Sequence, residues 1–475
     1  MAVGLALSAA SAAMAAVAFR CPTFGWLITV AFVPMVVAQH RFLPERWSGA
    51  AFAIGIGGFV AAYIAGVLDP SFHWWFRALP VAVAIPMWFF GWADRRFHRV
   101  TNYRYFAIAT PLAWAAVDFL RGGTPFAGTR ASLPYALFNH PSLLQPVAIT
   151  GIAGLNLLIV LVNWCVAGLL LRRVTGRSAV AVGTCVAVWV AGSAAMLRHP
   201  GPDVRVAAIQ PGVRSADADE LARNVAQTRE AARRGARLIV WREMTVPFDP
   251  TKHETNVFTS LARETGAFLV IGYVVDTRRA RRNEAVTISP DGKILGTYAK
   301  QHPAMMFSGD DRAPRATGFP TFDTPIGTLA SIICFDLDFT DTSRGFARAG
   351  AQLVAVPSLD PPNDATTHYP LLVFRAIENR LTMIKAETKY ASAIIDPYGR
   401  IVAAALSTRG RRATVVADVP LGSAHSPYVT FGDTFGWLLA AASAGLYIGD
   451  ATRRRRRIDN LVPRRNLQPN GCRCS

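Results

Sequence analysis

The chain has 475 residues, of which 52% are hydrophobic and only 17% are charged, whereas about a quarter of the residues of an average soluble domain are charged. With a mean hydropathy of +0.26, this composition argues against an ordinary soluble protein and for a membrane protein with a soluble part. The net charge of +19 does not indicate nucleic-acid binding, because the arginines stand in short loops between apolar runs and in the C-terminal tail.

Residues 1–198 are predicted to form a transmembrane bundle. Seven apolar runs near membrane-spanning length occur there, at residues 3–19, 24–39, 49–67, 79–93, 104–120, 146–171 and 178–196. The loops after the second, fourth and sixth runs are richer in arginine than the alternate loops. The positive-inside rule then places the N-terminus in the cytoplasm and brings the chain to the outer side near residue 199.

A further span is predicted near the C-terminus. Residues 426–450 contain an apolar run that is marginal in length, and five consecutive arginines, residues 453–457, follow it. Such a cluster is the expected cytoplasmic stop of a returning helix. We therefore expect a C-terminal transmembrane helix, a basic cytoplasmic tail at 451–475, and both termini in the cytoplasm.

The loop between the fifth and sixth spans mixes aromatic, glycine and proline residues over 118–146. Two interpretations stay open. It is either a plain interfacial loop or part of a site through which lipid reaches the protein.

Residues 199–425 are predicted to form an α/β domain outside the membrane, because strand and helix patterns alternate there. Strands are expected at 204–210, 237–241, 267–274, 285–289, 294–295, 327–334, 352–357, 382–386, 392–396 and 413–419. Helices are expected at 216–234, at 255–265, in a stretch ending at 345, and at 368–380.

Three polar residues of this domain stand at or directly after the ends of predicted strands, where the chain leaves a sheet. They are Glu243, Lys300 and Cys334. A carboxylate can take a thiol proton, a thiolate can attack a carbonyl, and a lysine can stabilise the resulting oxyanion. Taken singly, Glu243 and Lys300 are more often surface charges, and Cys334 is more often a small core residue. Their convergence at one sheet edge is therefore the prediction to test.

At these residues the domain resembles the nitrilase superfamily, which implies an α-β-β-α sandwich and a Glu-Lys-Cys triad. The resemblance is carried by the motifs Trp241-Arg-Glu243, Tyr298-Ala-Lys300 and Ile333-Cys334-Phe-Asp336. It implies that Glu243 is the general base, Cys334 the nucleophile and Lys300 the oxyanion stabiliser.

With its membrane flanks, nearly the whole chain resembles the apolipoprotein N-acyltransferase family. Pro111 to Arg121, Gly151 to Asn156 and Tyr428 to Asp433 are similar to its fifth span, its sixth span and the segment before its last span. The resemblance implies transfer of an acyl chain from a phospholipid, through a thioester, to the terminal amine of a diacylglyceryl-cysteine lipoprotein. It also implies a multi-pass protein of the bacterial inner membrane, with the catalytic domain outside and no cofactor.

The chain departs from the usual motifs at several places. Arg242 stands where the family has proline, and Phe335-Asp336 stands where it has Tyr-Glu. The family's supporting glutamate after the lysine is absent, and Asp310 or Asp311 is the candidate to replace it. The supporting or substrate-binding candidates are Asp310, Asp311, Asp336, Trp241 and Glu378.

Two other functions stay open. One is a membrane-anchored amidase or an acyltransferase with another acceptor, and the other is a non-catalytic membrane protein that keeps the fold. His302 and His368 are possible site-lining residues, although solvated loop histidines are the commoner case. We expect no metal site, because the sequence contains no ligand cluster with metal spacing.

Overall fold

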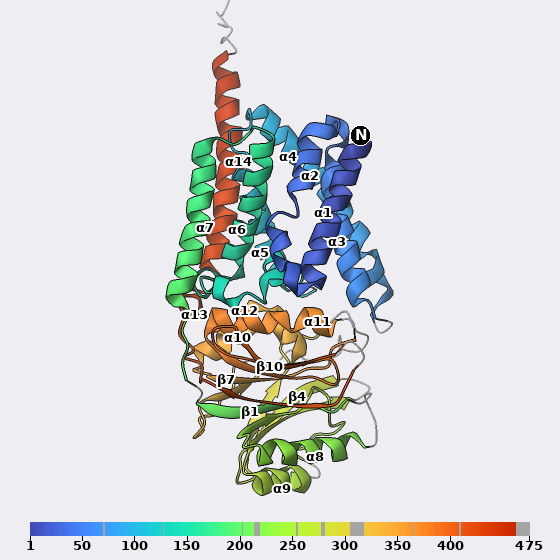
Figure 1. Cartoon of the computed structure of the whole chain (residues 1–475), viewed down its shortest axis with the longest axis vertical. Helices are drawn as coiled ribbons and strands as arrows, with labels where there is room; N and C mark the ends of the chain where they lie inside the picture. Colours follow the sequence, from blue (N-terminus) through green and yellow to red (C-terminus); the bar gives the residue numbers. More distant parts are fainter. Residues whose placement is uncertain are drawn as a thin grey trace, which may run out of the picture.

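The structure is a computed structural model that describes residues 1–461, except 70–71, 127, 202, 213–218, 253–254, 277–280, 305–317, 363 and 408–409. A bundle of long helices stands on an α/β domain, and both are seen in Figure 1 with the bundle above. The N-terminus and the far end of α14 lie at the end of the bundle away from the domain.

The bundle contains most of the long helices. They are α1 (Ala2–Arg20), α2 (Val33–Val37), α3 (Gly49–Val67), α4 (Leu79–Val100), α5 (Ala109–Gly122), α6 (Val147–Leu170), α7 (Gly176–Met196) and α14 (Thr434–Leu461). Among the described residues, six helical segments are long and apolar enough to cross a membrane: Ala2–Arg20, Pro22–Phe42, Glu45–Val67, Trp74–Val100, Val147–Leu170 and Gly176–Met196. The predicted fifth and eighth spans correspond to α5 and α14, which lie outside this set, so the count of eight stays a prediction.

The second predicted span is helical but broken. A 3-10 helix, η1 (Pro22–Thr29), is followed by α2 and then by a π-helix, η2 (Ala38–Phe42). Asn163 of α6 bridges the break, since its side chain accepts from the Phe32 N–H at 2.8 Å and donates to the Ile28 carbonyl at 3.0 Å. Backbone groups inside a bilayer need such partners, because no water is there to satisfy them.

The domain contains two sheets. The strands are β1 (Val204–Gln210), β2 (Leu238–Val240), β3 (Phe268–Asp276), β4 (Arg281–Ile288), β5 (Ile294–Ala299), β6 (Leu329–Ser331), β7 (Leu353–Pro357), β8 (Thr382–Ala386), β9 (Ala391–Ile395), β10 (Ile401–Leu406) and β11 (Ala413–Val419). Within the described chain the orders are β11-β1-β2-β3-β4-β5 and β10-β9-β8-β7-β6. In each sheet three neighbouring strands are parallel, β1-β2-β3 and β6-β7-β8, and the other pairs are antiparallel.

Helices cover the two outer faces of this pair of sheets. α8 (Glu220–Arg233) and α9 (Thr255–Thr265) lie against the first sheet, on the side away from the bundle. α10 (Thr340–Arg348), α11 (Ala365–His368) and α12 (Pro370–Asn379) lie between the second sheet and the bundle (Figure 1). The predicted α-β-β-α sandwich is therefore confirmed. The predicted helix at 368–380 corresponds to α12, and the sequence analysis missed the short helix α11 before it and the strand β10.

The domain and the bundle are joined by buried polar contacts. Gly151 interrupts α6 with a φ of +63°, and the next backbone N–H, of Ile152, donates to Glu378 of α12 at 3.1 Å. Glu378 also pairs with Arg375, whose guanidinium donates to the Tyr135 hydroxyl of the bundle at 2.9 Å. α13 (Pro427–Phe431) then leads from the domain back into α14. A buried polar junction of this kind holds the two parts in one arrangement.

Candidate active site

Cys334 lies at a sharp turn after a short strand. β6 ends at Ser331, so it is shorter than the predicted strand, and the 3-10 helix η8 (Cys334–Asp338) begins at the cysteine itself. Cys334 has a φ of +45°, in the left-handed region that non-glycine residues seldom adopt. Strain of this kind persists where the surroundings enforce it, and it concentrates at functional sites. The residue is only 8% exposed.

Glu243 and Lys300 lie together and are buried, so the interpretation of either as a surface charge is wrong. Lys300 Nζ donates to Glu243 Oε1 at 3.0 Å, and Asn283 of β4 donates to the same oxygen at 2.6 Å. Glu243 follows β2 and Lys300 follows β5, in the first sheet, whereas Cys334 follows β6 in the second. The site therefore lies where the two sheets meet.

Asp336 connects the lysine loop to the cysteine turn. It is fully buried, and it accepts hydrogen bonds from the Tyr298 hydroxyl at 2.7 Å, from the His302 N–H at 2.8 Å and from the Ile333 N–H at 2.9 Å. Burial raises the pKa of its carboxyl. These bonds span both sides of the site, so Asp336 sets the position of Lys300 relative to Cys334.

A second buried group of charges contacts the cysteine through Asp360, and sequence reasoning missed most of it. The Cys334 thiol donates to Asp360 Oδ1 at 3.4 Å, and the same oxygen lies 2.8 Å from His368 Nδ1. Lys385 of β8 pairs with the other oxygen of Asp360. The signal was a lysine inside the apolar strand Met383-Ile384-Lys385-Ala386, because a buried lysine needs an anionic partner. His368 is fully buried, so its interpretation as a solvated loop histidine is wrong.

The charges around the thiol favour its neutral form. Burial raises the pKa of Cys334 well above its usual range, Glu243 and Asp360 raise it further, and Lys300 opposes them. Burial alone would raise the pKa of Asp360, but His368 and Lys385 lower it below the usual carboxyl range. A base must therefore take the thiol proton as the sulfur attacks.

Cys334, Asp360 and His368 also offer ligand atoms within 4.8 Å of one another, the spacing of a metal site. Both ring nitrogens of His368 already face carboxylates, Asp360 at 2.8 Å and Asp338 at 3.1 Å, and the ammonium of Lys385 occupies Asp360. The carboxylate charges of Asp360 and Asp338 are therefore balanced by His368 and Lys385 without a metal ion.

His368 makes stability depend on pH. Burial alone would lower its pKa, but Asp360 and Asp338 outweigh burial and raise it from 6.5 to about 9. The stabilisation from this charge is complete below about pH 6.5 and is lost as the pH rises through about 9. We expect the apparent melting temperature of the protein in detergent to fall over this window, and the curve of His368→Gln to be flatter there. Parallel curves would contradict the assignment of this charge.

Two of the other predicted residues, Trp241 and Glu378, are held by contacts outside the cysteine turn. Trp241 is buried between α8 and α9, where its indole donates to Thr228 at 2.9 Å and packs edge-on against Phe258. Glu378 belongs to the junction with the bundle. Asp310 and Asp311 lie outside the described residues. His302 stacks on Phe339 with ring centroids 3.8 Å apart, so it does border the site.

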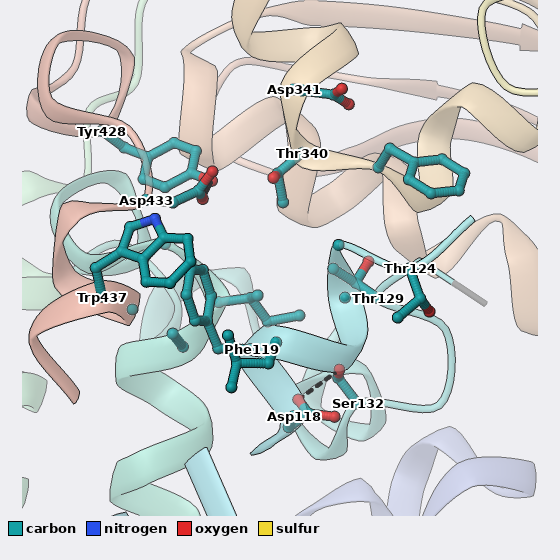
Figure 2. A pocket seen from close by; sticks show the side chains of 18 of the residues that line it. Asp118, Phe119, Thr124, Thr129, Ser132, Thr340, Asp341, Tyr428, Asp433 and Trp437 are labelled. Carbon is teal, nitrogen blue, oxygen red and sulfur yellow. Dashed lines mark hydrogen bonds between the residues drawn. The ribbon is translucent and has the colours of Figure 1, made fainter. Parts of the chain in front are cut away.

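A cavity of about 510 Å³ lies between the bundle and the domain (Figure 2). It is lined by the end of α5 from Asp118, by residues of the following loop up to Ser132, by the break in α6 at Gly151, and by the starts of α14 and α10. Figure 2 shows the Trp437 and Phe119 rings on one side and the hydroxyls of Thr124, Thr129 and Ser132 on another. His302 and Phe339 also line it, which brings the cavity close to the lysine loop and the cysteine turn.

Two family profiles match the chain. The carbon-nitrogen hydrolase family matches residues 205–426, and the apolipoprotein N-acyltransferase N-terminal domain matches residues 11–165. The apolipoprotein N-acyltransferase of Geobacter metallireducens is 26% identical over 506 residues, covering 91% of this chain and 92% of that protein. That of Gloeobacter violaceus is 27% identical over 494 residues and covers 93% of each.

Other similar proteins match the domain alone. Omega-amidase NIT2 of Mus musculus is 26% identical over 46% of this chain and 88% of its own length. The crystal structure of an amidase from Nesterenkonia sp. covers 47% of this chain and 93% of the amidase, at 22% identity and a TM-score of 0.41. Omega-amidase NIT2 therefore corresponds to the domain alone, whereas the two acyltransferases match both the bundle and the domain. The chain therefore belongs to the apolipoprotein N-acyltransferase family of the nitrilase superfamily.

Proposed function

We propose that this protein transfers an acyl chain from a phospholipid to the terminal amine of a diacylglyceryl-cysteine lipoprotein, through a thioester on Cys334. One observation carries the proposal: the cysteine turn lies against the membrane bundle. Phe335 and Phe339 pack with Ile64, Val67 and Phe76 of the bundle. An acyl chain could therefore reach the sulfur along apolar side chains without leaving the bilayer for water.

In the first half-reaction, Glu243 takes the thiol proton as the Cys334 sulfur attacks the ester carbonyl of the phospholipid. A C–S bond forms, and the ammonium of Lys300 stabilises the oxyanion. When the intermediate collapses, the C–O bond breaks and the proton on Glu243 passes to the lysophospholipid oxygen. Acyl-enzyme and lysophospholipid result.

In the second half-reaction, the neutral terminal amine of the lipoprotein attacks the thioester carbonyl. A C–N bond forms and the C–S bond breaks, while Glu243 takes a proton from the amine and returns it to the sulfur. Lys300 again stabilises the oxyanion. The products are the N-acylated lipoprotein and the free thiol, so the cycle closes without a cofactor.

The cavity supports the interpretation of the 118–146 loop as part of a lipid-access site. Its hydroxyl groups suit a polar headgroup, and the rings of Phe119 and Trp437 suit the interface of a bilayer. We place the protein in the bacterial inner membrane, with the catalytic domain on the outer side and both termini in the cytoplasm. The position of the N-terminus and the far end of α14, away from the domain, supports this topology.

The test is intact-protein mass after incubation with phosphatidylethanolamine vesicles. We expect one added acyl mass that hydroxylamine removes, no addition on Cys334→Ala, and an unchanged addition on Cys165→Ala, a buried cysteine of α6. A diacylated lipopeptide should then discharge the acyl-enzyme and gain the same mass. Rapid discharge by water without amine would instead indicate an amidase-like enzyme. No adduct on the folded protein would contradict acyl transfer.

A further inference from the structure

A chain of alternating charges runs from Cys334 to a loop of the membrane bundle. The thiol contacts Asp360 at 3.4 Å, Asp360 contacts His368 Nδ1 at 2.8 Å, and His368 Nε2 contacts Asp338 Oδ2 at 3.1 Å. Arg130 Nε then donates to the other oxygen of Asp338 at 2.6 Å. Arg130 belongs to the loop between α5 and α6, so the chain leaves the catalytic domain at this last contact.

The members of this chain are deeply buried. The side chains of His368 and Asp338 are 0% exposed and that of Asp360 is 2% exposed, while Arg130 retains 11%. Arg130 also pairs with Asp364, as Lys385 does with Asp360. Three carboxylates thus face three cationic groups. Buried charges hold one another in place in such a set, because removal of any member leaves its partner uncompensated.

The bundle loop is fitted closely onto the cysteine turn. The Thr129 N–H and hydroxyl both donate to the Asp338 carbonyl at 2.8 Å. Gly128 adopts a φ of +52°, and a Cβ there would lie 2.5 Å from the same carbonyl oxygen. Arg130 also lies over the Phe335 ring, 5.6 Å from its centroid. The loop can therefore occupy this place only when the turn that begins at Cys334 has its present shape.

We infer that Arg130, Asp338 and His368 are positioning residues that act through Asp360 on the Cys334 thiol. The contact of the α5–α6 loop with the catalytic domain then controls the position and the protonation of the nucleophile. Asp360 contacts the reacting sulfur directly and orients its proton. The inference rests on the proposed function only in taking Cys334 as the nucleophile. It adds to the site a second set of charged residues, which reaches the thiol through Asp360.

The groups that face the thiol come from every element around it. Glu243 after β2, Lys300 after β5, Asp360 after β7 and Lys385 of β8 act on the thiol itself. The charged groups around these are His368 of α11, Glu387 just beyond β8, Asp336 and Asp338 in η8, and Arg130 from the bundle. Removing the negative charge of Asp360 should favour the thiolate, and removing the positive charge of Arg130 should disfavour it. The two changes therefore act with opposite signs.

The experiment uses the full chain in detergent. Iodoacetamide alkylates Cys334 at about pH 8, and the rate of carbamidomethylation is measured from the mass of the peptide that contains this cysteine. Because this pH lies below the thiol pKa, the rate reports the thiolate fraction. We expect about a tenfold rise in Asp360→Asn and a several-fold fall in Arg130→Met. Arg400→Met is the matched control: it removes an arginine from the buried Asp396 in the β9–β10 turn, and it should leave the rate unchanged.

Acyl-enzyme formation is measured on the same variants. Asp360→Asn, His368→Gln and Arg130→Met should each lower the rate at saturating phospholipid by about ten- to a hundredfold, with little change in the concentration for half-saturation. Arg130→Lys restores the charge without the planar fork, so it should recover part of the rate.

Loss of structure gives a different pattern. If Arg130→Met only exposed the site to solvent, Cys334 would be alkylated faster than in the wild type, as in Asp360→Asn. This result would overturn the inference. Unchanged alkylation and acylation in both variants would overturn it as well. Alkylation needs no phospholipid, so opposite shifts with no acyl-enzyme in the wild type would uphold the positioning chain and reject the proposed reaction.

Discussion

Replacing Glu243 by Gln should slow acyl-enzyme formation by about 10²- to 10⁴-fold, the contribution of a well-placed general base. Gln keeps the shape of the side chain, and its oxygen can still accept from Lys300 and Asn283, which now contact Glu243 at 3.0 and 2.6 Å. What it loses is the capacity to take the thiol proton. Rapid mixing with phospholipid, acid quenching and intact mass measure the rate.

Two controls separate this effect from misfolding. Glu264→Gln changes an exposed glutamate paired with Arg229 on the outer helices, and it should acylate normally. Alkylation of Cys334 by iodoacetamide should not fall in Glu243→Gln, because Glu243 raises the thiol pKa and alkylation needs no base in this position. Acylation within about twofold of the wild type would show that another group takes the proton.

Arg242→Met should cost about 3–5 kcal/mol of stability, because it leaves a buried carboxylate without its partner. Arg242 is 1% exposed and holds Glu220 of α8 through two contacts of 2.6 Å, and its third nitrogen donates to the Glu243 carbonyl at 2.6 Å. Arg242, which stands where the family has proline, is thus paired with Glu220 and holds the backbone of the general base Glu243. The apparent melting temperature in detergent measures the loss.

The double variant Glu220→Gln/Arg242→Met should recover part of that loss, since no carboxylate is then left uncompensated. Arg229→Met is the matched control, because Arg229 makes an equally bidentate pair with Glu264 on the surface. Water and ions take over at an exposed pair, so little change is expected there. If Arg242→Met were as stable as Arg229→Met, the Arg242–Glu220 pair would contribute no stability.

The local patterns of the chain predict the apolar spans and the alternation of strands and helices, whereas the α-β-β-α sandwich is implied by the family resemblance. β8 and β11 have the predicted bounds, 382–386 and 413–419, and most other domain strands agree within a few residues. Glu243, Lys300 and Cys334 were selected because each follows a strand, and the structure gathers them between the two sheets. Asp336 is predicted as a supporting or substrate-binding residue, and its hydrogen bonds with Tyr298, His302 and Ile333 place it between the lysine loop and the cysteine turn.

The errors have a common physical origin. The second span is broken before α2, whose first turn contains Pro34, and Asn163 of α6 bonds to the backbone groups at the break, although the hydropathy of the span is that of a plain helix. The sequence favours a solvated position over a site-lining one for His368, because no local pattern shows its carboxylate partners, Asp360 and Asp338, which are 8 and 30 positions away. Glu378 is a supporting or substrate-binding candidate in the sequence, and the structure pairs it with Arg375 and with a backbone N–H in α6, 226 positions away.

The sequence by itself determined the apolar runs, the alternation of strands and helices, and the motifs of the triad, because hydrophobic periodicity and turn chemistry act between near neighbours. Only the tertiary structure decided which charges share the interior with Cys334. Arg130 and Asp338 stand 208 positions apart and come from different parts of the molecule. Their pairing depends on how the bundle is seated on the domain, since a buried charge is stable only where folding brings its partner within contact.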